Sequence, residues 1–175
     1  MKSAGWSLSA LIIAELAMVC GVPVWMQAQR PDQQATPVLW TLAASAANGT
    51  PVKRGAAVTA RLHASIKPGW HVYSLYEEPG GPTAMRIIAP SRESFAISGD
   101  FAVPPPQSGI DPGFAMETHF YAGDVDLTIP LRATRRTDQP VTLDVFYQAC
   151  NRETCLRPTI EHLTAPVAAA GGSQR

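Results

Sequence analysis

The stretch Ala56–Ile66, AAVTARLHASI, alternates apolar and polar side chains along most of its length. One side of the extended chain carries only apolar residues: Val58, Ala60, Leu62, Ala64 and Ile66. The other side carries Thr59, Arg61, His63 and Ser65. Successive side chains of a β-strand point to opposite faces, so this pattern predicts a strand with one face in the core and the other in solvent.

The same period of two recurs in two further stretches, VDLTIPLRA (125–133) and VTLDVFYQAC (141–150). Weaker strand candidates are VLWTLAAS (38–45), WHVYSL (70–75), MRIIAP (85–90), SFAISG (94–99) and TIEHLTAPV (159–167). Turn signals rich in Pro and Gly separate them, and no window after the N-terminal segment shows an uninterrupted helical period. We therefore predict an all-β fold, an antiparallel β-sandwich of about seven to nine strands, with PPPQSGIDPG (104–113) as its one long loop.

The N-terminal segment has one early Lys and then an apolar run from about Leu8 to Trp25, interrupted by Glu15. The run is short for a membrane span, which favours a secretory signal peptide. Two alternatives stay open, an uncleaved N-terminal anchor and a lipoprotein acylated at Cys20. The predicted organisation is a signal peptide at 1–28, a linker at 29–35, one domain at 36–167 and a disordered tail at 168–175.

Basic and acidic side chains balance, with 14 Lys and Arg against 14 Asp and Glu. A net charge of zero produces no long-range field that would attract nucleic acid, so we expect no nucleic-acid partner. Loss of the leader would leave two of the three cysteines, Cys150 and Cys155, in an exported compartment where disulfides form. An even count at close spacing indicates that the two cysteines pair with each other.

We expect Cys150 to end one strand and Cys155 to begin the next, with the four residues Asn-Arg-Glu-Thr between them, a common hairpin length. Opposed residues of an antiparallel pair have α-carbons about 4.5–5.5 Å apart, inside the roughly 4.4–6.8 Å range of disulfides. Closing so short a loop stabilises a fold by only about 2 kcal/mol. The residues alone leave two interpretations open, a structural bond and a redox-active pair. Arg152 and Arg157 are either thiolate-stabilising charges or ordinary solvated turn residues.

A metal site is disfavoured, because zinc normally takes four ligands and only His162 lies near the cysteines in the sequence. We expect neither a metal nor any other cofactor.

Three blocks of the chain resemble a known family. YQACNRETCLRP (147–158), KPGWHVYSLYEEPGGPTAMRI (67–87) and DPGFAMETHFYAGDVDLTIPL (111–131) are similar, in this family's order, to segments of the N-terminal periplasmic domain of the thiol:disulfide interchange protein DsbD. The resemblance implies an immunoglobulin-like β-sandwich in the periplasm, whose cysteine pair alternates between dithiol and disulfide. It also implies an oxidoreductase-type activity, thiol:disulfide interchange, in which the domain acts as a relay.

The resemblance further implies roles and partners. Cys155 would form mixed disulfides with partners, and Cys150 would resolve them. Phe114 is the best match for an aromatic residue in a cap loop that shields the pair, with Tyr73 and Tyr147 as supporting residues; Phe120 and Tyr121 are the alternatives for the cap. The electron donor would be a thioredoxin-like domain or a membrane thiol reductase, and the acceptors would be oxidised periplasmic proteins.

The chain departs from the family in two ways. Four residues separate its cysteines, where the best-known members have five, and the sequence ends at Arg175 with no membrane or thioredoxin-like domain, so we expect the donor to act in trans. Two other hypotheses compete with the relay. One is an exported, non-enzymatic binding or assembly module with a structural hairpin disulfide; the other is metal delivery by the cysteines with Met85, Met116 or His119.

Overall fold

The computed structural model describes residues 36–90 and 93–171 of the chain. These residues form twelve β-strands and no helix, so no helix among them could cross a membrane. The signal peptide predicted at 1–28 and the linker predicted at 29–35 lie outside the described residues.

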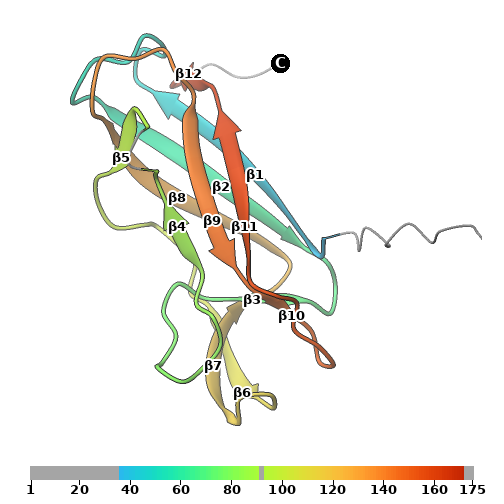
Figure 1. Cartoon of the computed structure of the whole chain (residues 1–175). Coiled ribbons are helices and arrows are strands. Elements are labelled where there is room, and N and C mark those ends of the chain that lie inside the picture. The colour runs from blue at the N-terminus through green and yellow to red at the C-terminus, as the bar shows by residue number, and fades with distance from the viewer. Residues whose placement is uncertain (1–35, 91–92, 172–175) are drawn as a thin grey trace, which may run out of the picture. The chain divides into compact units, whose positions relative to one another are not determined.

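The strands form three sheets (Figure 1). In spatial order, the first sheet contains β12 (Val167–Ala169), β1 (Val38–Ala46), β2 (Ala57–Ile66), β8 (Asp124–Ala133) and β5 (Phe95–Ile97). The second contains β11 (Thr159–Ala165), β9 (Val141–Tyr147) and β4 (Arg86–Ile88). The third contains β10 (Ala149–Cys150), β3 (His71–Tyr73), β7 (Met116–Tyr121) and β6 (Gln107–Asp111). Neighbouring strands are antiparallel except for the parallel pair β1 and β12.

The first and second sheets pack face to face, as the alternation of apolar residues predicts. The five inward-facing residues of β2 are buried, and so are those of β9: Val141, Leu143, Val145 and Tyr147. Trp40 of β1 meets Tyr147 of β9 across the interior, with ring centroids 5.3 Å apart in an edge-on arrangement. Burying each large apolar side chain contributes about 1.5–3 kcal/mol, so this interior is the main source of stability. The predicted antiparallel β-sandwich is confirmed.

Every stretch predicted as a strand contains one, but two predictions at the periphery are wrong. The stretch 104–113 is not one long loop, because Gln107–Asp111 forms β6 and pairs with β7. Most of β6 is exposed, so it lacks the apolar alternation by which a half-buried strand is recognised. The disordered tail predicted from 168 begins too early, because Ala168 and Ala169 belong to β12 and pair with β1. Backbone pairing rather than side-chain burial holds these two segments in place.

The third sheet extends from one end of the sandwich and carries the cysteine segment. The pairing of β9 with β11 ends at Tyr147 and Thr159. The chain then leaves the second sheet, and β10 pairs with β3. Cys155 therefore does not begin the next long strand, as the sequence suggests, but forms an isolated bridge with Cys150. Figure 1 shows this turn and the β6–β7 hairpin at the same end of the domain.

Candidate functional site

Cys150 and Cys155 are joined by a disulfide, with their α-carbons 4.1 Å apart. Between them the chain reverses in a turn that is closed by backbone hydrogen bonds. The N–H of Asn151 donates to the carbonyl of Thr154, and the N–H of Leu156 donates to the carbonyl of Ala149. The predicted pairing of the two cysteines is thus present in the structure.

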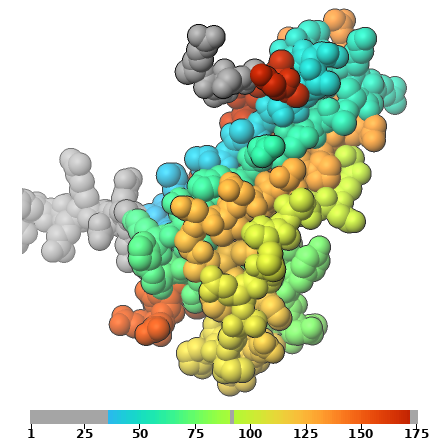
Figure 2. Space-filling view, turned by 180° about the vertical axis from the view of Figure 1, so that it is seen from behind, coloured from blue at the N-terminus to red at the C-terminus, as the bar shows by residue number. Residues whose placement is uncertain are grey.

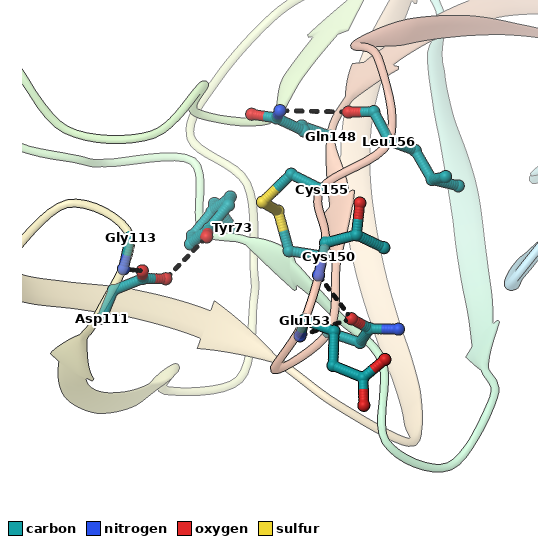
Figure 3. Close-up of a disulfide and its surroundings, with 10 residues drawn as sticks. Tyr73, Asp111, Gly113, Gln148, Cys150, Glu153, Cys155 and Leu156 are labelled. Carbon is teal, nitrogen blue, oxygen red and sulfur yellow. Dashed lines mark hydrogen bonds between the residues drawn. A yellow bond between two sulfur atoms is a disulfide. The ribbon is translucent and has the colours of Figure 1, made fainter.

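Two amide side chains hold this turn in shape. The Asn151 Oδ1 atom accepts hydrogen bonds from the backbone N–H groups of Glu153 and Thr154, both at 2.8 Å. Asparagine is favoured in turns because its side chain can bond the backbone two residues on. Gln148 Nε2 donates to the Leu156 carbonyl at 3.1 Å and links the two arms of the turn (Figure 3).

The two cysteines differ in their access to solvent. Cys150 is only 1% exposed, whereas Cys155 is exposed. The difference follows from the fold, because Cys150 belongs to β10 in the sheet, while Cys155 lies in the returning arm of the turn. A partner molecule can therefore approach Cys155 more readily than Cys150.

Cys155 opens onto a groove of about 750 Å³. The turn residues 151–155 line one side of this groove, and β6 with its following loop, residues 109–113, lines the other. Trp70, His71, Thr118 and Phe120 are among the remaining lining residues. Figure 2 shows the turn (orange-red) and the β6–β7 hairpin (yellow) as two projections from the same end of the domain. The groove is large enough to admit a side chain or a short peptide segment of a partner.

Tyr73 and Asp111 connect the β6–β7 hairpin to the strand beside the cysteines. The Tyr73 hydroxyl donates to Asp111 Oδ2 at 2.7 Å, and the N–H of Gly113 donates to Asp111 Oδ1 at 2.8 Å. Phe114, in the same hairpin loop, meets the Tyr73 ring edge-on with centroids 6.2 Å apart. Burial and the neighbouring Asp111 carboxylate raise the pKa of Tyr73 well above its usual value. The hairpin loop is therefore held to β3 by a hydrogen bond and an aromatic contact (Figure 3).

His71 lies directly opposite Cys150 in the register of β3 and β10. Its ring packs against those of Tyr73 and Phe120, with centroids 5.2 and 5.1 Å away. Burial lowers the pKa of His71, and the charge of Asp111 opposes that shift.

The residues predicted to surround the cysteines take different positions. Tyr73 is buried beside the site, and Phe114 lies in the hairpin loop against it. Tyr147 packs on Trp40 in the core of the sandwich, and its hydroxyl has no hydrogen-bond partner among the described residues. Met85, considered for metal delivery, is also buried in the core. Among the described residues, no three His, Cys, Asp or Glu side chains gather in a way that could hold a metal ion.

Two acidic residues of this region were not found from the sequence. Asp111 sits in a stretch interpreted as loop, and nothing local predicts its bond to Tyr73. The Glu77 carboxylate accepts hydrogen bonds from the N–H of His119 and from the Ser74 hydroxyl, and so ties the segment after β3 to β7. The contact between Glu77 and His119 spans 42 positions in the chain, which only the folded structure reveals.

The family model described as "Thiol:disulfide interchange protein DsbD, N-terminal" matches residues 41–166. The chain belongs to this family. Membership of the DsbD N-terminal family confirms the resemblance seen in the three sequence blocks. It also confirms, together with the all-β architecture, the predicted immunoglobulin-like fold class, and it associates the chain with thiol–disulfide interchange.

Three solved structures are similar to the chain, each with a TM-score of 0.45. The reduced DsbD N-terminal domain of Neisseria meningitidis is 14% identical, over 70% of this chain and 82% of that one. The N-terminal periplasmic domain of ScsB from Proteus mirabilis is 21% identical, over 73% of this chain and 44% of that one. A complex between the DsbD and PilB N-terminal domains from N. meningitidis is matched at 11% identity, over 71% of this chain and 80% of that one. A comparison with curated protein sequences gave no match.

The raised pKa of Tyr73 predicts a loss of stability in alkali. The folded state holds the Tyr73 proton more tightly than the unfolded state, whose tyrosines titrate near pH 10. The contribution to stability is therefore complete below about pH 10 and is lost as the pH rises toward the higher pKa of the folded state. In Tyr73→Phe we expect the free energy of unfolding, measured by urea titration between about pH 9 and 11, to fall less steeply with pH than in the wild type.

Tyr76→Phe is the matched control, because Tyr76 is 80% exposed. It should retain the slope of the wild type. Equal slopes in Tyr73→Phe and the wild type would show that the fold, through burial and Asp111, does not raise the pKa of Tyr73.

Proposed function

We propose that this domain is a periplasmic thiol–disulfide relay that works through Cys150 and Cys155. The observation that carries the proposal is the unequal exposure of the two cysteines beside an open groove, with Cys155 exposed and Cys150 1% exposed. A purely structural bond has no need of an exposed half, whereas exchange requires a sulfur that a partner can reach. The family's association with thiol:disulfide interchange supports the same conclusion.

The chemistry runs in two halves. An incoming donor thiolate attacks the sulfur of Cys155, and Cys150 leaves as a thiolate that takes up a proton. A second donor thiol then resolves the mixed disulfide, so that the pair gains two electrons and two protons. In the other half, the Cys155 thiolate attacks the disulfide of an acceptor, and Cys150 attacks Cys155 to release the acceptor as a dithiol. The domain ends oxidised and ready for another cycle.

The partners that fit this cycle are themselves dithiols and disulfides. We infer that a thioredoxin-like domain or a membrane thiol reductase supplies electrons and that oxidised periplasmic proteins accept them. The groove beside Cys155 suits a protruding active-site segment better than a flat surface, because the hairpin loop 109–113 lines the groove together with the turn that carries Cys155. The bond from Tyr73 to Asp111 and the contact of Phe114 support one wall, which makes these residues candidates for controlling access.

The reduction potential of the pair tests this function directly. The isolated domain is equilibrated with glutathione buffers of known ratio, and the fraction of dithiol is counted by alkylation and mass spectrometry. We expect a potential above about −300 mV, in the range of exchanging pairs. A potential well below that value would mean that the bond is structural, and the domain would then be a binding or assembly module.

A further inference from the structure

The buried cysteine raises a question of proton transfer. When a donor thiolate attacks Cys155, the sulfur of Cys150 departs with a negative charge inside the protein. Cys150 is 1% exposed, so water cannot solvate that charge. Burial in apolar surroundings raises the pKa of a thiol and makes its thiolate a poor leaving group. A neighbouring group that gives a proton to Cys150, and takes it back in the reverse step, would remove this obstacle.

His71 is placed to be that group. It is the residue directly opposite Cys150 in the antiparallel pair of β3 and β10, and side chains opposed in this way lie on the same face with β-carbons about 4.5–5.5 Å apart. The ring is kept in place by Tyr73 on one side and Phe120 on another, and His71 also lines the groove together with Cys155. The imidazole of His71 is therefore next to Cys150 and also at the groove, which is open to solvent.

The other titratable groups around His71 are less suited to the task. The Tyr73 proton is already donated to Asp111, and Asp111 accepts from Tyr73 and from Gly113. Arg152 and Glu153 line the groove from the exposed turn, and an arginine does not release its proton. Histidine alone in this set changes charge between about pH 5 and 8.

On the basis of the proposed function, we propose that His71 acts as the proton acceptor and donor for Cys150 during exchange. In the oxidative direction the Cys150 thiol attacks the sulfur of Cys155 in the mixed disulfide, and its proton moves to the imidazole. The Cys150–Cys155 bond forms as the bond to the partner breaks, and the departing partner thiolate takes the proton through the groove. In the reductive direction the imidazole takes the proton of the incoming donor thiol from the groove and passes it to Cys150 as that sulfur leaves. No further oxidant or reductant is needed beyond the partner itself.

Reaction of the reduced domain with 5,5′-dithiobis(2-nitrobenzoate) separates the two steps. Attack by Cys155 releases one coloured thiolate, and attack by Cys150 on the resulting mixed disulfide releases the second. We expect His71→Gln to slow the second phase by about tenfold or more at pH 7 and to leave the first phase nearly unchanged. Between about pH 6.5 and 8 the second phase of the wild type should vary little with pH. In the variant it should rise about tenfold per pH unit, because only the free thiolate then reacts.

His162→Gln is the matched control, since His162 is an exposed histidine on β11 that is bonded to Asp144. It should keep both phases at their wild-type rates. The pH profile of the wild type provides a test that needs no variant, and a second phase that rises tenfold per unit there would overturn the role of His71. A second phase that is unaltered in His71→Gln would do the same while leaving the relay intact. The absence of both phases in the reduced wild type would instead refute the relay on which the proposal rests.

Discussion

We expect Cys155→Ser to abolish thiol–disulfide exchange and Cys150→Ser to stop it after the first step, so that a covalent complex with the partner accumulates. The expectation rests on access, because only Cys155 is exposed on the groove. With Cys150 replaced, we expect the Cys155 thiolate still to attack a partner disulfide, but the domain then has no second thiol beside it to resolve the mixed disulfide. With Cys155 replaced, the remaining thiol is 1% exposed and a partner cannot reach it.

The two variants control for each other. Each removes the same disulfide and its stabilisation, about 2 kcal/mol for so short a loop. Cys150→Ser also places a hydroxyl at a buried position, so both variants are first shown by urea titration to be folded, and a difference in adduct yield then reports on chemistry rather than on folding. Each reduced variant is incubated with an oxidised thioredoxin-like domain, and the products are weighed by mass spectrometry with and without dithiothreitol. Adducts of equal yield on both variants would contradict the division of roles, and the absence of any adduct would count against the relay itself.

The sandwich could be predicted from the sequence because its strands are half-buried. Alternation in β2 and β8 is a direct consequence of one face meeting the core, and every inward residue expected for β2 is buried. β6 could not be predicted, since it has no buried face and is defined by its backbone pairing with β7. Pattern reasoning detects burial, so an element that buries little leaves no periodic signal.

The candidate site likewise has one feature that the sequence predicts and others that it does not. The pairing of Cys150 with Cys155 follows from spacing and compartment, and the structure contains it. The unequal exposure of the two cysteines does not follow from spacing, because it depends on the pairing of β10 with β3 after the end of β9. The bond between Tyr73 and Asp111 joins residues 38 positions apart and requires the hairpin to fold back on β3. Long-range contacts of this kind determine which residues line the groove, and no local pattern in a single sequence predicts them.

Packing in the interior of the sandwich supports the core, whereas the third sheet carries the candidate site. A second prediction of large effect follows from this difference. The side chain of Leu62 is fully buried in β2, where its neighbours across the strands are Leu42 and Leu127. Removing the buried methyl groups in Leu62→Ala loses their transfer free energy and leaves a cavity. We expect a loss of about 2–5 kcal/mol in the free energy of unfolding, measured by urea titration.

Leu39→Ala is the matched control, because the same change is made on the adjacent strand β1 at a side chain that is 66% exposed. It should alter stability by no more than about 0.5 kcal/mol. Cys150 and His71 belong to the third sheet, which pairs its own strands independently of β2, so the folded fraction of Leu62→Ala should keep the reduction potential of the wild type. A shift of that potential in Leu62→Ala, with none in Leu39→Ala, would mean that the sandwich interior sets the chemistry of the pair. It would then be wrong that the turn 151–155, β3 and the β6–β7 hairpin determine the properties of the site without the sandwich interior.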